Sequence, residues 1–438
     1  MKFPALKNTF ARQFSYSLLT KIFMIVLRMA RNAILARVLG PADRGVFSLL
    51  SSLPEMVMTA GNCGVANAAA YYAANDPGRR RRLFENINST LFFMAVVLFG
   101  ASLLWVQQTW LVKGDVQTIL AYKWYVAAGT VLVLYKAVNY NLLNVLNLVA
   151  QVNFFSLLES LLPLVLFLVF WLAFAVTPIL AAVYSWFLSL AVVALLSSYG
   201  RGHFLTMRID APVQRDLFSY GSRSYFDSLF LKLLLRLDFL FVSAMVGAEG
   251  LGYYAMATAA AELLLIVPNS LAIPLFSFLL KTGIKEKNAT IATLLRLLFA
   301  GMIVLALLFW VFGKLLILVF FGKDYLPAYL PMVLLLPGLV GLSFVTPIRL
   351  ALLGENRPGA VSIIGGLSLV MDVVLNYLLI PSWGIEGAAF AATVSYVFGA
   401  IALSLLFLRL FDLRPRDVLL VRIADIKEVL RLVQGERK

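Results

Sequence analysis

Long apolar stretches, separated by short polar turns, fill most of the chain. Each stretch holds about 20 or more residues, the length that a helix needs to cross a bilayer core of about 30 Å. The pattern predicts twelve membrane-spanning helices, at residues 18–39, 46–72, 88–111, 118–146, 153–175, 178–199, 223–246, 251–279, 291–320, 326–352, 360–380 and 385–410. The turns between them are rich in Gly, Pro, Asp and Lys, which favour the ends of helices.

The amino-acid composition indicates the same class of protein. Of the 438 residues, 62% are hydrophobic and 13% are charged, and the mean hydropathy is +0.90. Soluble domains carry about 25% charged residues. An outer-membrane barrel would show strands of about ten residues with alternating polarity in place of continuous apolar segments. We therefore predict an all-α polytopic membrane protein.

Positive charges outside the predicted spans are shared unequally between the two sides of the membrane. Twenty-one Lys and Arg residues fall on one side, and three, Arg44, Lys113 and Lys323, fall on the other. Because cytoplasmic loops carry the excess of Lys and Arg, we expect both termini to be cytoplasmic. The loops account for the formal net charge of +15, so we expect no nucleic-acid partner.

The chain contains an internal repeat at a constant offset of 207 residues. Residues 39–47 align with residues 246–254, and Glu55 aligns with Glu262. The repeat predicts two pseudo-symmetric six-helix bundles, at residues 1–207 and 208–411, related by an axis along the membrane normal. Transporters built in this way bind substrate between the halves and rock the halves to alternate access.

The last segment, residues 412–438, differs from the spans. Its apolar residues recur at helical spacing, and charged residues lie between them: Leu419, Ile423, Ile426, Leu430 and Val433. This pattern predicts a cytoplasmic amphipathic helix in contact with the membrane lipids of the inner leaflet. The alternative is a helix that docks a partner protein.

Two arginines, Arg28 and Arg31, lie at the middle of the first predicted span, on one arc of the helix with Lys21. On an insertion scale each central Arg costs roughly 2.5–3.5 kcal/mol, whereas each Leu or Ile returns only about 0.3–0.6 kcal/mol. Lys21 is close enough to the interface to extend its amine towards it. We therefore expect the arc to face water or a bound anion inside the protein.

Further charged residues interrupt the later spans. The cations are candidates for a substrate-binding cavity: Arg28, Arg31, Lys136, Lys232, Arg236 and Arg349. The carboxylates are candidates for ion coupling or for counter-charges: Glu55, Glu262, Asp238 and Asp372. Arginine binds phosphate bidentately and stays charged, so the cations favour an anionic lipid headgroup. The alternative is internal pairing, of Arg28 or Arg31 with Glu55, and of Arg236 with Asp238 or Glu262.

The sequence contains no pattern typical of a catalytic site or of a bound metal. Cys63 is the only cysteine and His203 the only histidine, which excludes an internal disulfide and a His/Cys metal cluster. No Ser/His/Asp, Cys/His or paired-carboxylate arrangement suggests catalysis, so we expect no enzyme. We also expect no cofactor beyond a coupling ion, H⁺ or Na⁺, held by a buried carboxylate.

Three stretches resemble a known family. They are ARNAILARVLGPADRGVFSLLSSLPEMV at 30–57, VSAMVGAEGLGYYAMATAAAELL at 242–264 and LLIPSWGIEGAAFAATVSYVFGAI at 378–401. Together they resemble the polysaccharide transporter family, the oligosaccharide flippases of the multidrug/oligosaccharidyl-lipid/polysaccharide (MOP) exporter superfamily. The resemblance implies two six-helix bundles in a V shape.

The resemblance also implies a function. It implies that the chain flips a polyprenyl-pyrophosphate-linked oligosaccharide across the bacterial inner membrane by alternating access, for polysaccharide synthesis, with polymerase or assembly proteins as partners. The related lipid II flippases carry cavity arginines on their first helix, and Arg28 and Arg31 lie in the matching RxxRxAIxAR pattern. Those flippases usually have two further helices, so the twelve predicted spans favour an oligosaccharide flippase.

Other functions remain open at this stage. An ion-coupled drug or cation antiporter of the same superfamily is one alternative, although cationic drugs prefer carboxylates to arginines. A membrane scaffold for polysaccharide assembly, which recruits enzymes through its tail, is another. An integral glycosyltransferase would need acidic catalytic residues in a large loop outside the membrane.

Overall fold

A computed structural model describes residues 4–75, 78, 80–107, 113, 116–146, 148–201, 206–266, 268, 284–354, 358–420, 422 and 425. These residues form helices, and no strand occurs among them. The helices are α1 (Pro4–Gly61), α2 (Val65–Asn75), α3 (Arg80–Val106), α4 (Val116–Ala121), α5 (Lys123–Val145), α6 (Val149–Leu168), η3 (Val169–Ala173), α7 (Pro178–Arg201), α8 (Ala211–Leu234), α9 (Leu237–Met245), α10 (Ala248–Ala261), η4 (Glu262–Leu265), α12 (Ile284–Phe320), η5 (Lys323–Ala328), α13 (Tyr329–Gly354), α14 (Pro358–Leu410) and α15 (Pro415–Leu419).

Seven helices among the described residues are long and apolar enough to cross a membrane. They are Arg80–Val106, Lys123–Val145, Val149–Ala173, Pro178–Tyr199, Ile291–Phe320, Lys323–Arg349 and Gly359–Leu410. The other predicted spans fall on α1, α2 and α8 to α10, and part of the predicted span at 251–279 lies outside the described residues. The all-α membrane fold is confirmed, and the count of twelve spans stays a prediction.

Glycines separate two pairs of predicted spans that the structure joins into single helical runs. The helix α1 kinks at Gly40 (φ 70°), and α14 kinks at Gly384 (φ 59°). Residues with a side chain rarely adopt such positive φ values, so glycine reverses the chain here without a loop. Gly247, which the repeat aligns with Gly40, is also left-handed (φ 109°).

One predicted span is broken. The apolar run at 223–246 forms α8 and α9, with a turn at residues 235–236 between them. The break falls where Lys232, Arg236 and Asp238 interrupt the apolar sequence. Arg236 occupies the position before the first turn of α9, with an extended φ of −139°. The charges therefore lie at helix ends, where unpaired main-chain groups accompany them.

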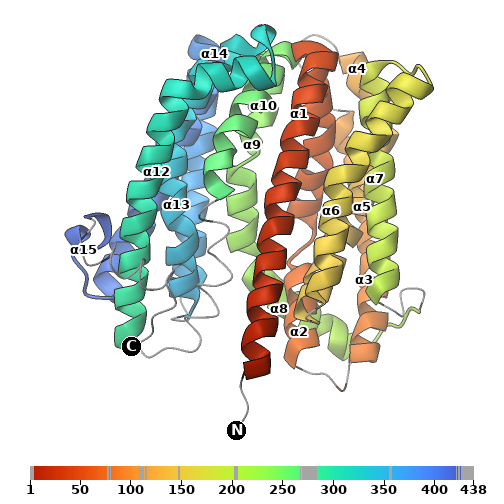
Figure 1. The fold of residues 1–438 in the computed structure, drawn as a ribbon. Helices are drawn as coiled ribbons and strands as arrows, with labels where there is room; N and C mark the ends of the chain where they lie inside the picture. The colour runs from red at the N-terminus through yellow and green to blue at the C-terminus, as the bar shows by residue number, and fades with distance from the viewer. Residues whose placement is uncertain are drawn as a thin grey trace. The chain divides into compact units, whose positions relative to one another are not determined.

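Contacts divide the chain into two compact units. Unit 1 comprises Met1–Lys232, Gly247–Gly252 and Phe320–Asp324, and unit 2 comprises the segments between and after these. Within unit 1, α5 packs against α1, α2, α3, α6 and α7, and α1, α5, α6 and α7 run side by side in Figure 1. Fully buried apolar side chains such as Ile87, Leu134 and Val138 fill its core.

The first part of α8 belongs to unit 1, so the boundary by contacts falls after Lys232 and not at the predicted position after residue 207. The hydroxyl of Tyr225 on α8 donates to the carbonyl of Thr59 at 3.0 Å. The main chains of Gly64 and Gly221 touch, since a Cβ at Gly64 would lie 2.1 Å from the oxygen of Gly221. These contacts attach α8 to the end of α1.

A second close approach lies in unit 1, at the kink of α1. A Cβ at Gly45 would lie 1.8 Å from the carbonyl oxygen of Ala248, and a Cβ at Gly252 would lie 1.9 Å from that of Pro41. At an offset of 207 residues, Gly45 aligns with Gly252 and Pro41 with Ala248. The two contacts are therefore equivalent under the repeat. We call these four residues the glycine clasp.

Unit 2 is built around the pair α13 and α14, with α9 against α14. The Thr393 hydroxyl donates to the carbonyl of Leu334 at 2.5 Å, and Gly338 lies against Thr393. The Tyr396 hydroxyl donates to the carbonyl of Leu234 at 3.2 Å. These bonds hold the second arm of α14 against α13 and against the last residue of α8.

The chain after α14 is attached to unit 2 by a buried ion pair. Arg296 of α12 donates from Nε to Asp425 at 2.6 Å and from Nη2 at 2.5 Å, and both side chains are nearly inaccessible. This arginine lowers the pKa of Asp425 through its hydrogen bond. The predicted amphipathic helix over 412–438 lies mostly outside the described residues, which include only the short α15 in this segment.

Candidate functional site

Two arginines on α1 face the neighbouring helix α6. Arg28 is exposed, and its Nε donates to the hydroxyl of Ser160 at 3.1 Å. Arg31 lies one turn further along and is half-buried. Its Nε is buried without a hydrogen-bond partner among the described residues. Both arginines thus lie against the protein, and Arg31 keeps an unused donor.

A charged pair on α5 and α6 adjoins these arginines. Lys136 Nζ donates to Glu159 Oε1 at 2.9 Å, and the Tyr140 hydroxyl donates to Glu159 Oε2 at 3.2 Å. Glu159 precedes Ser160, the partner of Arg28, in α6. Arg28 and Glu159 both interact electrostatically with Arg31.

These groups form one cationic cluster in unit 1, made of Arg28, Arg31, Lys136, Tyr140, Glu159 and Ser160. It holds three cations and one carboxylate. Exposure of Arg28 to hydrocarbon would carry the insertion cost of a central arginine, about 2.5–3.5 kcal/mol. Its exposed face is therefore suited to water or to an anionic ligand. The arrangement favours phosphate, which guanidinium groups bind through paired, charge-assisted hydrogen bonds.

Two candidate residues of unit 1 lie outside this cluster. Glu55 is exposed on the second arm of α1, and the ion pairs among the described residues do not include it. The alternative in which Arg28 or Arg31 pairs with Glu55 does not occur among the described ion pairs, and Arg28 instead donates to Ser160 of α6. Lys232 is exposed in the last turn of α8 and likewise takes part in none of the described ion pairs.

In unit 2 the predicted pairing of Arg236 is confirmed, with Glu262 as its partner. The two guanidinium nitrogens donate to the two carboxylate oxygens at 2.6 and 3.2 Å. The guanidinium also lies over the ring of Phe239, 5.5 Å from its centre. Arg236 is thus held by a bidentate ion pair and is less available for a ligand than Arg31.

The two remaining candidate carboxylates of unit 2, Asp238 and Asp372, are buried. Asp238 accepts hydrogen bonds from the Tyr254 hydroxyl and from the main-chain N–H of Phe239. Asp372 on α14 is fully buried, and neither of its carboxylate oxygens has a hydrogen-bond partner in the described part of the chain. The side-chain oxygen of Asn376, one turn later, is also without a partner there. Asp238 and Asp372 interact electrostatically.

The other predicted site residue of unit 2 is Arg349. It lies half-buried on α13. The structure therefore joins Arg28, Arg31 and Lys136 into one cluster, and it joins Arg236, Glu262, Asp238 and Asp372 into a second neighbourhood. No group of three or more metal-binding side chains occurs among the residues that the structure describes.

The sequence marks Glu159 as an ionisable residue inside a predicted span, but it did not predict Glu159, Ser160 or Tyr254 as residues of the site. Glu159 is an ionisable residue in a predicted span, which is a signal for a functional or pairing role. Its role as the partner of Lys136 depends on the rotation of α6 relative to α5. The apolar pattern of a membrane helix leaves that rotation undetermined, since lipid-facing and buried positions are both apolar.

Comparison with known proteins places this geometry in context. Residues 34–330 match the family described as "Polysaccharide biosynthesis protein". No curated protein matches the chain in sequence.

Solved structures share the fold. One is an inward-facing multidrug resistance MATE family transporter of the MOP superfamily, with a TM-score of 0.74 and 16% identity over 89% of this chain and 94% of that chain. Another is the outward-facing conformation of such a transporter, with a TM-score of 0.68 and 15% identity over 91% and 94%. The lipid II flippase MurJ, in an inward closed conformation, has a TM-score of 0.70 and 12% identity over 97% and 93%. The predicted MOP-type fold is confirmed.

Proposed function

The chain belongs to the polysaccharide biosynthesis protein family, and on this premise we propose that it is a flippase for a polyprenyl-pyrophosphate-linked oligosaccharide. It moves this lipid across the bacterial inner membrane by alternating access, with both termini in the cytoplasm. The fold shared with MOP transporters and with a lipid II flippase supports a transport function. The observation that carries the proposal is the cationic cluster of unit 1.

The chemistry of the cluster suits a pyrophosphate. Lys136 is neutralised by Glu159, whereas Arg28 and Arg31 have no carboxylate partner at hydrogen-bond distance among the described residues. A pyrophosphate cannot enter hydrocarbon alone, because the cost of removing an ion from water is large. Two guanidinium groups replace that hydration, while the polyprenyl chain stays in lipid. The Nε of Arg31 gains the partner that it lacks.

In this proposal, the ion that drives transport binds in unit 2. A buried carboxylate without hydrogen-bond donors is costly when charged, so it binds a proton or a cation. Asp372 meets this description, and Asp238 lies near it. We propose H⁺ or Na⁺ as the coupling ion, with these two carboxylates and the Asn376 oxygen as its site. Glu262 serves as the counter-charge of Arg236.

Translocation in liposomes tests the proposal. The purified chain is reconstituted in liposomes with a fluorescent polyprenyl-pyrophosphate sugar. A quencher outside the liposomes reaches only sugar in the outer leaflet, so movement to the inner leaflet is measured as fluorescence that the quencher no longer removes. A hydrogen bond to a charged group contributes about 1.5–3 kcal/mol. Arg28→Ala and Arg31→Ala are therefore each expected to slow translocation by roughly tenfold or more, with normal amounts of folded protein.

The control for this assay is Arg409→Ala, which removes an exposed cation from the last turn of α14. It is expected to leave translocation unchanged. Normal translocation by both α1 variants would refute the proposed site.

The second candidate function is an ion-coupled drug or cation antiporter. The three carboxylates of unit 2, Asp238, Glu262 and Asp372, favour it, since they attract cations. Efflux of a cationic dye from the same liposomes, inhibited by Asp372→Asn and unaffected by Arg31→Ala, would support the antiporter. We expect no dye efflux and no enzymatic activity.

A further inference from the structure

An extended segment between α7 and α8 lies along the first turns of α3. We call residues 206–210 the strap. The side chains of Asn88 and Ser89 donate to the carbonyls of Thr206 and Arg208 at 2.8 and 2.9 Å. The main-chain N–H of Arg208 donates to the carbonyl of Glu85 at 3.2 Å. The main chain of the strap is therefore fixed to α3.

Two apolar side chains of the strap are exposed. Met207 and Ile209 are 58% and 65% exposed, although both are apolar. The strap thus presents an apolar pair outward, at the end of a helix long and apolar enough to cross the membrane.

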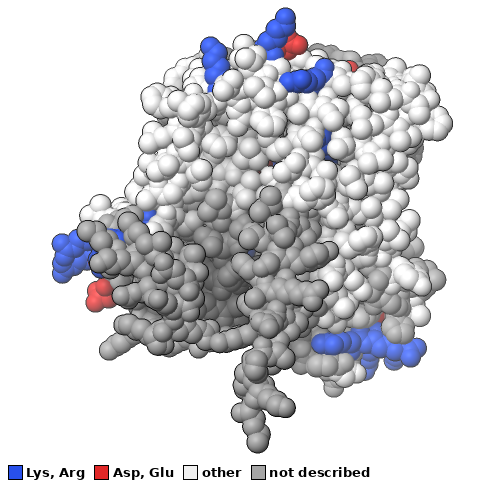
Figure 2. Space-filling model, viewed as in Figure 1, with Lys and Arg blue, Asp and Glu red and all other residues white. Residues whose placement is uncertain are grey.

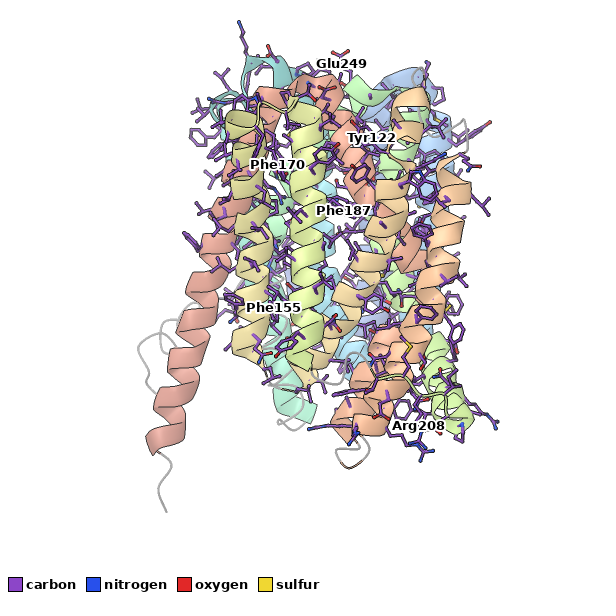
Figure 3. The ribbon with its side chains drawn as sticks, turned by 90° about the vertical axis from the view of Figure 1, so that its right-hand side faces the viewer. Tyr122, Phe155, Phe170, Phe187, Arg208 and Glu249 are labelled. Atoms are coloured by element: carbon purple, nitrogen blue, oxygen red, sulfur yellow. The ribbon has the colours of Figure 1, made fainter. Side chains whose placement is uncertain are left out.

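Three exposed guanidinium groups belong to the strap and to the first turn of α3, to which the strap is bonded. The side chains of Arg81, Arg82 and Arg208 are 73%, 46% and 54% exposed. Figure 2 shows cationic side chains gathered where α3 begins, and Figure 3 places Arg208 at the opposite end of unit 1 from Glu249 and Tyr122. The cations outnumber their carboxylate partners, Glu85 and Asp210.

Asp210 keeps the cations in position. Arg82 Nε lies 2.5 Å from its carboxylate and Arg208 Nε lies 3.1 Å from it. The hydrogen bond from Arg82 lowers the pKa of Asp210 from 3.8 to about 2, so the carboxylate is ionised at neutral pH. Although they are paired with carboxylates, Arg81, Arg82 and Arg208 remain about half exposed or more, so their guanidinium groups can also bind a further anion.

We propose that the strap is a binding site for an anionic phospholipid of the inner leaflet. Met207 and Ile209 contact the acyl chains near the headgroup, and Arg81 and Arg208 bind the phosphate. Apolar residues flanked by arginines at the membrane surface recognise anionic lipids in this way. The site goes beyond the proposed transport of oligosaccharide and rests only on the topology that places this end in the cytoplasm.

Binding of defined lipids to the purified full-length chain tests the site. Phosphatidylglycerol or phosphatidylcholine is added in detergent, and the lipid retained is counted by native mass spectrometry. Arg81→Ala/Arg208→Ala is expected to lower retention of phosphatidylglycerol about tenfold or more, since each cation near the surface contributes about a fivefold change. Retention of phosphatidylcholine is expected to stay unchanged.

Two further variants separate the parts of the site. Met207→Ser/Ile209→Ser is expected to lower retention of both lipids, because it removes the contact with acyl chains. Lys314→Ala/Arg409→Ala removes two exposed cations elsewhere in the chain, on α12 and α14, and is expected to change neither. The main chain holds the strap, so the thermal midpoint without lipid is expected to be unchanged in all three.

An equal loss of phosphatidylglycerol retention in the Lys314/Arg409 control would overturn the site, because it would show a general effect of charge. Unchanged retention in both strap variants would overturn it too, and would leave a soluble acidic protein as the occupant. Should the arginine variant fail to fold, Arg81→Lys/Arg208→Lys must retain most of the binding, and about 1 M salt must weaken it in the wild type.

Discussion

Arg28 and Arg31 have different surroundings although they lie one helical turn apart. Arg28 donates to Ser160 and keeps an exposed face, whereas the Nε of Arg31 is buried without a partner among the described residues. Lys136 is paired with Glu159. The unbalanced positive charge of the cluster therefore belongs to the arginines. We assign Lys136 a structural role, because its ion pair with Glu159 holds α5 against α6.

The Lys136–Glu159 pair allows a direct test of that assignment. The two side chains are 13% and 31% exposed, so removal of one partner leaves the other charge partly buried. We expect Lys136→Met and Glu159→Gln each to lower the free energy of unfolding by about 1–2 kcal/mol, below the range for a fully buried pair. The double variant is expected to lose less than the sum of the two. Thermal unfolding in detergent measures all three, and additive losses would contradict a direct pair.

At this scale the sequence predicted which residues carry charge in the membrane, but only some of their partners. The arc shared by Arg28 and Arg31 indicated an inward face, and Arg28 does lie against α6. The alternative pairing with Glu55 is not among the described ion pairs, and Glu159 was not considered as a partner. A partner on another helix depends on the relative rotation of the two helices, which the apolar pattern does not determine.

At the scale of elements, short polar turns located most helix ends. The turn at 41–45 and the turn at 381–384 are tighter than expected, because a left-handed glycine reverses the chain within a helical run. The break between α8 and α9 was not predicted, since residues 223–246 are apolar enough to read as one helix. The charged residues in that run were its only signal.

The glycine clasp provides the prediction at this scale. Gly45→Ala and Gly252→Ala each place a methyl group within 2 Å of a carbonyl oxygen, so the main chains must separate. We expect each variant to lower the thermal midpoint markedly and by a similar amount, because the two contacts are equivalent under the repeat.

The control for the clasp is a glycine with open space around it. Gly100 in α3 and Gly301 in α12 have no atom within 4 Å of an added Cβ. Alanine there is expected to be neutral or to stabilise the helix by about 0.5–1 kcal/mol. Equal effects at Gly45 and at Gly100 would contradict the close approach.

At the scale of the whole molecule, the two repeats carry opposite charges at one equivalent position. At the offset of 207 residues, Arg31 of unit 1 aligns with Asp238 of unit 2. Unit 1 holds the cationic cluster, and unit 2 holds the buried carboxylates. In the proposed mechanism one copy of the repeat binds the anionic lipid and the other binds the coupling cation.

Binding of a short-chain polyprenyl pyrophosphate that carries one sugar tests this division of roles most directly. The purified chain and its variants are titrated with the labelled lipid in detergent. The account predicts that Arg28→Ala/Arg31→Ala weakens binding at least tenfold, whereas Asp238→Asn/Asp372→Asn leaves it intact. Unchanged binding by the arginine variant, or a loss confined to the aspartate variant, would contradict the assignment of the pyrophosphate to unit 1.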